Sequence, residues 1–412
     1  MDLKNRSYQE LSEIIDYIQD WNVISKEPNV INISLLSGLP GIILTLLDTN
    51  ATYPELVNLK KIKSLIDHLL DILYKSENLL PSYCGGIAGL GFLLDNLKEQ
   101  NVLYDAEYDD ILEEIDSVLE DMFKVEIEED NIDMLHGALG IGLYFIKRKN
   151  ERNVLEIINF LEKTAIKKDN QIYWKVFDKH VEKDFFYDFG LAHGNAGILY
   201  FFLKCIKHNI LIDKSKAMAR EMIIFFTQNT QTLSSDIYSF YQYKIEVSAF
   251  DDSEYKPTNS RLAWCYGDLG ILHTLLIASK ILEDESLEKY AIEKLYHVSD
   301  RLSEREITKH DMDAGFCHGT GGVAFIFKNV YELTKDVKFL PTIDHWTKKT
   351  FEMKDIKSHD GFNILGYSFP VFEDTTQNVT FLEGLAGVAA SNLKYLSKKP
   401  LVFIEEAVFL TV

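Results

Sequence analysis

The sequence contains a G-x-x-G element seven times, and this repeat limits the folds that the chain can adopt. The elements begin at Gly38, Gly86, Gly137, Gly194, Gly267, Gly319 and Gly384. Successive first glycines are 48, 51, 57, 73, 52 and 65 residues apart. Each separation is about the length of a helical hairpin with its loops, and the two longest leave room for insertions. The repeat therefore predicts seven helical hairpins.

Two kinds of helix are expected to alternate along this repeat. The segments after G-x-x-G, such as 197–208 and 270–282, are apolar on nearly all sides, which is typical of helices buried in an inner layer. Between them lie amphipathic segments, such as 60–76 and 287–302, with apolar residues every three or four positions. Seven such pairs favour an all-α fold of the α/α-toroid type, and an open helical array is the alternative.

Two stretches interrupt the helical pattern, at about 170–190 and 233–258. Both are rich in aromatic and alternating residues, which favour strands, and both fall in or near the long separations. We expect them to be non-helical insertions over one end of the ring, with ordinary surface loops as the alternative. Residues 1–412 are otherwise expected to form a single domain.

The glycines and the helix starts point to one end of this ring as the site. Glycines three residues apart lie on one helix face and allow close backbone approach, and the first can also adopt the positive φ of a tight turn. If all inner helices run the same way, their N-termini gather at one end. Their unpaired N–H groups would favour thiolates or oxyanions there.

Composition excludes several classes of protein. With 46% hydrophobic residues the chain has enough apolar material for an extensive core. The 64 acidic and 43 basic residues give a net charge of −21, which repels nucleic acid. The start of the chain lacks the apolar core of a signal peptide, and Gly38, Pro40 and Gly41 interrupt the most apolar early stretch. We therefore expect a cytoplasmic protein.

The residues directly before the first glycines are expected to point toward the same end. They are Ser37, Gly85, His136, His193, Tyr266, His318 and Glu383. Cys265 and Cys317 each lie one position earlier in neighbouring repeats, 52 residues apart. Two thiolates and a neutral imidazole form a zinc ligand set that leaves the fourth tetrahedral position open. A closed structural zinc site that includes Cys84, or two buried cysteines without metal, are the alternatives.

The proposed donor set also indicates a class of reaction. Zinc bound by two thiolates carries no net charge, so it is a poor electrophile but binds a third thiolate well and lowers its pKa. This chemistry favours alkylation of a substrate thiol. Hydrolysis by a zinc-bound hydroxide usually involves histidine or carboxylate ligands and is the weaker alternative.

Three motifs then resemble a known family. "LAHGNAGI" at 191–198, "SRLAWCYGDLG" at 260–270 and "GFCHGTGG" at 315–322 resemble the lanthipeptide cyclases, the C components of lantibiotic synthetases, which are related to eukaryotic LanC-like proteins. The resemblance covers essentially all 412 residues. This length leaves no room for the dehydratase domain of bifunctional synthetases, so a stand-alone class I cyclase is expected.

The resemblance implies a fold and an activity. The fold would be a double α/α toroid of seven inner and seven outer helices, with one zinc ion and a small inserted β-containing segment. The reaction would be Michael-type addition of peptide cysteine thiols to dehydroalanine or dehydrobutyrine, which forms lanthionine or methyllanthionine rings. The substrate would be a dehydrated precursor peptide, leader plus core. A complex with a dehydratase and an exporter, peripheral at the inner membrane face, is also implied.

The resemblance further implies roles for individual residues. The zinc ligands would be Cys265, Cys317 and His318. His193 would carry a proton, and a pKa near neutrality suits that role. Asp133 would lie beside this histidine and fix its tautomer. Arg261 and Tyr266 would lie near the zinc and stabilise the developing enolate oxygen. These are the site residues that the sequence predicts.

Each catalytic assignment has a simpler alternative. Asp133 could cap a helix, Arg261 could form a structural ion pair, and Tyr266 could pack against Trp264. His136 replaces the acid expected in some relatives, and we interpret it as a satisfied hydrogen-bonding residue rather than a second ionisable group in the pocket.

Two other functions remain open from the sequence. One is a non-catalytic zinc protein that binds glutathione or another thiol. The other is an α/α-toroid glycosidase, which needs two carboxylates, and Glu383 and Asp133 are the candidates at the expected rim. The two cysteines and the histidine have no place in glycosidase chemistry.

Overall fold

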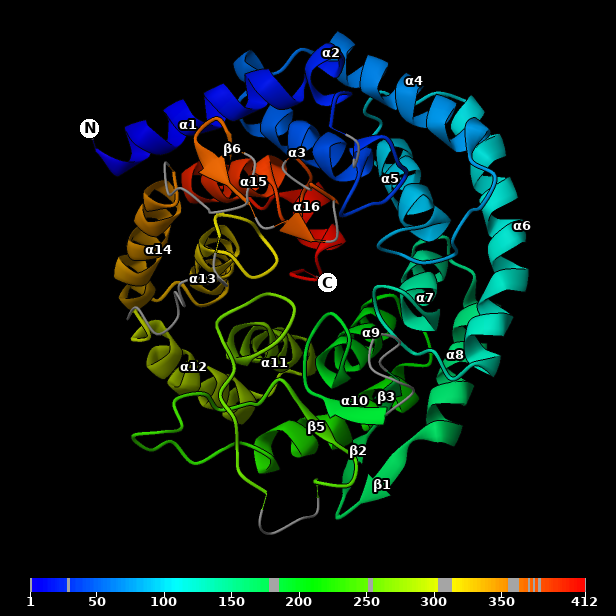
Figure 1. Ribbon diagram of the computed structural model, residues 1–412. Helices are drawn as coiled ribbons and strands as arrows, with labels where there is room; N and C mark the ends of the chain where they lie inside the picture. The colour runs from blue at the N-terminus through cyan, green and yellow to red at the C-terminus, as the bar shows by residue number, and fades with distance from the viewer. Residues whose placement is uncertain are drawn as a thin grey trace. The chain divides into compact units, whose positions relative to one another are not determined.

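The structure is a computed structural model, and its described residues form two compact units, each mostly helical (Figure 1). The described residues are 2–27, 30–177, 185–250, 255–302, 313–354, 363–369, 371–372, 375–376 and 379–411. The first unit comprises Met1–Leu80, Cys84–Asp105 and Ser299–Thr411. The second unit comprises Pro81–Tyr83 and Ala106–Val298, together with the last residue. Each unit is described by itself below.

The first unit contains four of the apolar helices and the amphipathic helices that cover them (Figure 1). The apolar helices are α3 (Leu39–Thr52), α5 (Ile87–Glu99), α13 (Thr320–Thr334) and α15 (Leu385–Leu396). The covering helices are α1 (Leu3–Ile18), α4 (Leu59–Lys75) and α14 (Leu340–Glu352). The short helices α2 (Trp21–Ile24) and α16 (Val402–Ala407) complete the unit, with the 3-10 turns η2 (Pro54–Leu56) and η3 (Val337–Phe339).

The second unit repeats the same alternation. Its apolar helices are α7 (Ala138–Lys147), α9 (Asn195–Lys207) and α11 (Asp268–Leu282). Its covering helices are α6 (Glu107–Glu128), α8 (Glu151–Thr164), α10 (Ile212–Gln228) and α12 (Glu285–Ser299). The helix α9 packs between α7 and α11 in this unit. The order of inner and outer helices therefore follows the repeat.

Every first glycine of the seven G-x-x-G elements is the N-cap of an inner helix, as the repeat predicts. The inner helices are buried on nearly all sides, and α7 is buried at every residue. The outer helix α4 buries only one stripe, which includes Ile62, Leu65 and Leu69. An outer layer thus covers a fully apolar inner layer, which is where the core of each unit lies.

The first glycines are required for two different physical reasons. Gly267 has a φ of +86°, which residues with a side chain adopt rarely. Gly38 has an extended φ of −143°, so conformation does not require a glycine there. Instead, a Cβ on Gly38 would lie 2.8 Å from the carbonyl oxygen of Asn32. The positive-φ explanation therefore applies to Gly267, and close approach explains Gly38.

The first and last repeats lie side by side within the first unit (Figure 1). A Cβ added to Gly41 of α3 would lie 2.8 Å from Cβ of Phe381, which precedes α15. The N–H of Leu382 donates to the carbonyl oxygen of Leu36 at 3.1 Å. An open array would keep its first and last repeats apart. This contact favours a closed arrangement of repeats.

Backbone hydrogen bonds join the turns that precede neighbouring inner helices. In the first unit, the N–H groups of Phe316 and Cys317 donate to the carbonyl oxygen of Leu382 at 2.8 and 2.9 Å. In the second unit, the N–H groups of Leu191 and Ala192 donate to the carbonyl oxygen of Cys265 at 2.9 and 3.0 Å. The N-termini of inner helices are therefore gathered at one end within each unit.

The second unit also contains five short strands, four of them in the stretches where we expected no helix and β1 just before the first stretch. A hairpin is formed by β1 (Ile166–Lys168) and β2 (Gln171–Tyr173). An antiparallel sheet has the order β3 (Val176–Phe177), β4 (Phe185–Asp188) and β5 (Lys244–Glu246), and Tyr187 pairs with Ile245. Residues 178–184 and 251–254 of these stretches lie outside the described residues.

The first unit contains two small hairpins that the sequence analysis did not predict. They are formed by β6 (Asn363–Ile364) with β7 (Tyr367–Ser368), and by β8 (Val371–Phe372) with β9 (Thr375–Thr376). Both lie in the 65-residue separation, which had room for an insertion.

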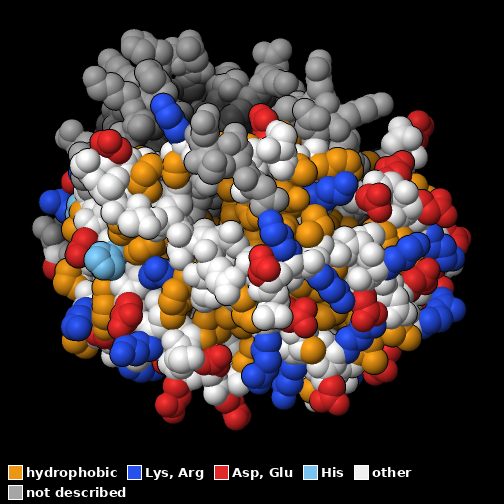
Figure 2. Space-filling view, turned by 90° about the horizontal axis from the view of Figure 1, so that it is seen from below, with side chains coloured by type: hydrophobic (Ala, Val, Ile, Leu, Met, Phe, Trp, Pro, Cys, Tyr) orange, Lys and Arg blue, Asp and Glu red, His pale blue; other side chains and the backbone are white. Residues whose placement is uncertain are grey.

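Acidic and basic side chains are interspersed on the face of the molecule shown in Figure 2. Across the described chain, none of the helices combines the length and the apolar character needed to cross a membrane.

Candidate active site

Asp133 and His193 form the best-defined polar pair of the second unit. They lie in the turns before α7 and α9, and Nδ1 of His193 is 2.7 Å from Oδ2 of Asp133. The other carboxylate oxygen of Asp133 accepts hydrogen bonds from the N–H groups of Leu135 and His136, both at 2.7 Å. Asp133 therefore stabilises its own turn and also orients His193. The N-cap of α7 is Gly137, so Asp133 is not that cap.

The pair is ionised at neutral pH. Burial lowers the pKa of His193, but the charge and hydrogen bond of Asp133 more than offset it and raise this pKa to about 9. Burial alone would raise the pKa of Asp133, but the neighbouring His193 lowers it below its usual value. With Nδ1–H directed at Asp133, the imidazolium retains a second proton on Nε2. The His193 side chain is 38% exposed, so this proton can be donated to a bound molecule.

His136 lies next to this pair. Its ring stacks on the ring of His193, with centroids 5.8 Å apart and an interplanar angle of 15°. The residue is exposed, and its positive charge helps to lower the pKa of Asp133. Asp133 therefore faces two imidazoles, and His136 is an ionisable neighbour of the pair. The sequence analysis favoured a satisfied hydrogen-bonding role for His136.

Cys265, Tyr266 and Arg261 lie in the next turn of the same unit. This turn contacts the turn of His193 through the hydrogen bonds to the carbonyl oxygen of Cys265. Cys265 is buried, with 5% of its surface exposed. The guanidinium of Arg261 lies 5.1 Å from the ring centroid of Tyr266, and the Tyr266 ring lies 4.2 Å from that of Tyr243. The structure thus places the predicted residues of this unit on three consecutive turns.

A buried carboxyl group that the sequence analysis missed supports the turn of His193. Asp188 accepts a hydrogen bond from the N–H of Gly190 at 2.6 Å, and burial raises its pKa to about 6. An asparagine or aspartate recurs six residues before a first glycine, at Asn32, Asn131, Asp188, Asp313 and Asn378. This spacing is visible in the sequence and, at the first four of these positions, identifies the side chains that support the turns.

Cys317 and His318 lie in the turn before α13 of the first unit. The His318 side chain is 11% exposed, and its Nε2 is 3.3 Å from Oε1 of Glu383, in the turn before α15. Its Nδ1 is 3.7 Å from Oδ2 of Asp313. Cys317 is half-buried, whereas Cys84, in the turn before α5, is buried. The two predicted zinc donors of this unit are therefore adjacent, and carboxylates flank the imidazole.

The donor chemistry of these turns fits a zinc ion. Thiolate sulfur and imidazole nitrogen are zinc donors, and a zinc-bound histidine usually directs its other nitrogen at a carboxylate, as His318 does toward Glu383. The third predicted donor, Cys265, belongs to the second unit. Within the part of the chain that the structure describes, no three His, Cys, Asp or Glu side chains gather closely enough to hold a metal ion.

Comparison with known proteins identifies the family. The family model described as "Lanthionine synthetase C-like protein" matches residues 29–407. This chain belongs to the lanthionine synthetase C-like family. Its membership confirms the resemblance that the cysteine and histidine motifs indicated.

A relative and a solved structure agree with this assignment. This lanthionine synthetase C-like protein is 23% identical over 364 residues to the nisin biosynthesis protein NisC of Lactococcus lactis subsp. lactis, which covers 80% of this chain and 82% of the relative. It also resembles the solved structure of a nisin cyclase, with a TM-score of 0.75 and 20% identity over 97% of this chain and 96% of that chain. The likeness shows that the fold is an α/α toroid, as predicted.

Proposed function

We propose that this lanthionine synthetase C-like protein is a zinc-dependent lanthipeptide cyclase. It would add a cysteine thiol of a dehydrated precursor peptide to a dehydroalanine or dehydrobutyrine of the same peptide, which forms a lanthionine or methyllanthionine ring. Family membership and the likeness to NisC support a cyclase. The observation that carries the proposal is the Asp133–His193 pair, whose histidine lies in a turn that is hydrogen-bonded to the carbonyl oxygen of Cys265.

Cys265, Cys317 and His318 would hold the zinc ion. When bound, zinc would lower the pKa of the substrate thiol and keep it as a nucleophilic thiolate. Glu383, with Oε1 3.3 Å from Nε2 of His318, would fix the orientation of that imidazole. A donor set with two thiolates suits the activation of a substrate thiol for carbon–sulfur bond formation.

The proton balance of the addition assigns a role to His193. The thiol loses its proton, the sulfur bonds to Cβ of the dehydro residue, and the electron pair of the double bond moves to form an enolate. The Nε2–H of the His193 imidazolium would protonate Cα of this enolate. The proton released from the thiol restores the imidazolium, so no co-reactant is consumed.

Asp133, Arg261 and Tyr266 would assist this transfer. Asp133 accepts the Nδ1–H of His193 and stabilises the cation. Arg261, whose guanidinium lies over the Tyr266 ring, would provide a fixed positive charge for the enolate oxygen. The hydroxyl of Tyr266 would donate a hydrogen bond to the same oxygen. Resemblance to the family supports these last two roles.

We also propose that the dehydrated precursor reaches the enzyme within a complex that contains a dehydratase and an exporter. This proposal rests on membership of the family. Co-purification of the tagged chain with both partners from its own cells, compared with an untagged control, tests it.

The experiment that tests the catalytic proposal uses a dehydrated peptide with one free cysteine. The wild-type protein with zinc should consume the thiol without changing the mass of the peptide, and the product should resist thiol alkylation. Binding of the peptide without loss of thiol would instead support a thiol-binding protein. Cys317→Ala, assayed beside the wild type for both bound zinc and activity, links the reaction to the metal site.

A further inference from the structure

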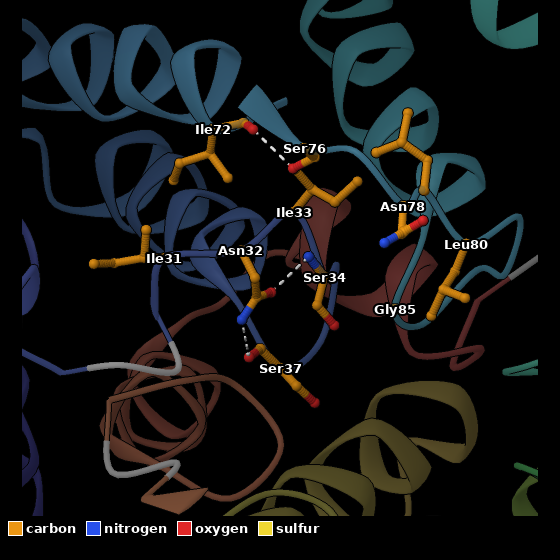
Figure 3. Close-up of a pocket in the computed structure, with 11 residues that line it drawn as sticks. Ile31, Asn32, Ile33, Ser34, Ser37, Ile72, Ser76, Asn78, Leu80 and Gly85 are labelled. Carbon is orange, nitrogen blue, oxygen red and sulfur yellow. Dashed lines mark hydrogen bonds between the residues drawn. The ribbon is translucent and has the colours of Figure 1, made fainter. Parts of the chain in front are cut away.

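A cavity lies in the first unit, apart from the predicted zinc donors. It has a volume of about 330 Å³ and opens between the loop that precedes α3 and the segment that follows α4 (Figure 3). Ile31, Asn32 and Ser37 line it from the first side, and Ser76, Asn78 and Leu80 from the second. The volume is at the lower end of the range typical of ligand pockets, roughly 300–1,000 Å³.

The position of the cavity follows from the repeat. Its lining includes Ser37 and Gly85, which are the residues directly before the first glycines of the first two repeats. The other five repeats have a larger side chain at this position: His136, His193, Tyr266, His318 and Glu383. Small residues therefore leave room where the other repeats have ionisable groups. The cavity opens at the end of the inner helices where His318 lies in the same unit.

The lining of the cavity suits an uncharged ligand. None of its eleven lining residues carries a formal charge, although the whole chain has a net charge of −21. Two of the aliphatic lining residues are well exposed, Ile31 at 49% and Leu80 at 61%. Exposed aliphatic side chains at the edge of a pocket are typical of sites that bind an apolar group.

Polar groups of the cavity have two different roles. Asn32 stabilises the wall, because its Oδ1 accepts from the N–H of Ser34 at 2.8 Å and its Nδ2 donates to the carbonyl oxygen of Ser37 at 3.5 Å (Figure 3). The side chain of Asn78 is exposed and offers an amide to a ligand. An amide beside aliphatic side chains suits a peptide segment, which presents both a side chain and backbone amide groups.

The cavity lies within reach of a peptide that reacts near Cys317. The turn of Cys317 donates to Leu382, and Leu382 donates to Leu36, which lies beside the cavity. The cavity is thus two inner helices away, which corresponds to roughly 16–20 Å at an interaxial distance of about 8–10 Å. An extended peptide covers this distance with about five or six residues, at roughly 3.3–3.6 Å each.

We propose that this cavity is a recognition subsite for the precursor peptide, which binds an uncharged aliphatic residue about six positions from the reacting cysteine. The proposal rests on the proposed cyclase function, because it takes the position of the thiol from Cys317 and His318. Ile31 and Leu80 contact the aliphatic side chain, and Asn78 contacts the neighbouring peptide amide. The subsite determines which precursors are bound well and takes no part in the proton transfers.

The test compares one variant, one control and two matched pairs of probes. The variant Leu80→Asp places a charge in the cavity, and Val337→Asp places one at a similarly exposed residue of the same unit, 65% exposed and outside the cavity. The probes are fluorescein-labelled peptides with one cysteine and one dehydroalanine. The two peptides of a pair differ at one position, which is leucine in one and glutamate in the other. This position lies six residues before the cysteine in the first pair and six residues after it in the second.

In one of the two pairs, the wild type should bind the leucine peptide about tenfold more tightly than the glutamate peptide. Fluorescence anisotropy measures this difference in Kd, and KM should differ by the same factor. A tenfold change in Kd corresponds to about 1.4 kcal/mol, which is less than the free energy gained when a leucine side chain is fully buried. Leu80→Asp should abolish the preference, so that the leucine and glutamate peptides have the same Kd and KM, while bound zinc matches the wild type. Val337→Asp should retain the preference.

The outcomes separate the subsite from the cyclase function. A leucine preference that persists in Leu80→Asp, or that is absent from the wild type in both pairs, overturns the subsite while cyclisation stands. Leu80-dependent binding without any loss of thiol overturns the cyclase function and leaves the peptide-binding cavity supported.

Discussion

The Nδ1–H of His193 donates to Oδ2 of Asp133 over 2.7 Å, and this hydrogen bond joins the turns before α7 and α9. Burial lowers the pKa of His193, but the charge of Asp133 and this hydrogen bond outweigh burial, so the charged form is favoured and the pKa rises to about 9. His193 therefore begins the proposed reaction as an acid. A histidine with an ordinary pKa would be mostly neutral at the same pH.

Replacement of Asp133 by asparagine should remove the preference of His193 for its charged form. The pKa of His193 should fall toward its ordinary value, and kcat should fall by about 10²–10⁴-fold, the usual contribution of a positioned acid or base. Ring proton NMR of His193 measures the first effect and steady-state cyclisation the second. Asp130→Asn, at an exposed residue of the same loop, serves as the control and should resemble the wild type. An unchanged His193 titration in Asp133→Asn would contradict the assignment.

The pH dependence of the wild type follows from the same pair. The folded pKa of His193 is raised above its unfolded value, so its contribution to stability is fully present below about pH 6.5 and is lost as the pH rises through about 9. As the proton donor it should give a kcat that falls about tenfold per pH unit above pH 9. A pH–rate profile between pH 6 and 10 measures this decrease in kcat. A kcat that rises through pH 9 would identify His193 as a base instead.

Asp48 should make the stability depend on pH in a range where surface carboxylates do not titrate. Its buried carboxylate accepts hydrogen bonds from the N–H groups of Phe403 and Ile404 at the start of α16, and burial raises its pKa to about 7. A raised carboxyl pKa stabilises the fold at low pH, and this stabilisation is lost as the pH rises through 7. The contribution of Asp48 to the free energy of unfolding should therefore fall by about 1 kcal/mol from pH 6 to pH 8.

Chemical denaturation at several pH values measures this slope. Asp48→Asn should remove the contribution of Asp48, whereas Asp67→Asn, at an exposed residue of α4, should retain it. Equal slopes in all three proteins would show that Asp48 does not titrate in this range.

The predicted zinc ligands can be tested without an activity assay. Cys265→Ala and Cys317→Ala should each reduce bound zinc from about one equivalent to a small fraction, because two remaining donors hold zinc weakly. Cys205→Ala is a matched control, since Cys205 is fully buried in α9 and burial raises its pKa far above the usual thiol value. Metal analysis after dialysis measures the effect. Full zinc in Cys265→Ala would remove that residue from the site.

The positions of the turns were easier to predict from the sequence than the side chains that stabilise those turns. The first glycines located the starts of all seven inner helices, because a helix start at a crowded turn leaves a clear local signal. The support from Asp188 depends on a side chain that folds back over its own turn. Its signal is an asparagine or aspartate six residues before the first glycine, which the G-x-x-G pattern itself does not include. The hairpins β6–β7 and β8–β9 have strands of two residues, too short for an alternating pattern to be recognised.

The second glycine of the first repeat provides a test of the contact between the first and last repeats. Gly41 is the third residue of α3, and a Cβ there would lie 2.8 Å from Cβ of Phe381 and 2.7 Å from the carbonyl oxygen of Leu35. Alanine in place of glycine inside a helix normally stabilises it by about 1 kcal/mol. At this position the overpacking should instead destabilise the protein by about 1–3 kcal/mol.

Denaturant unfolding of Gly41→Ala measures the sign of this effect. Asn50→Ala, at a half-buried position of the same helix, serves as the control for helix propensity and should leave the stability unchanged or slightly raised. If Gly41→Ala is also as stable as the wild type, the turns before α3 and α15 have room for a methyl group. The packing of the first repeat against the last would then not depend on the glycine, and its recurrence at this position would need another cause.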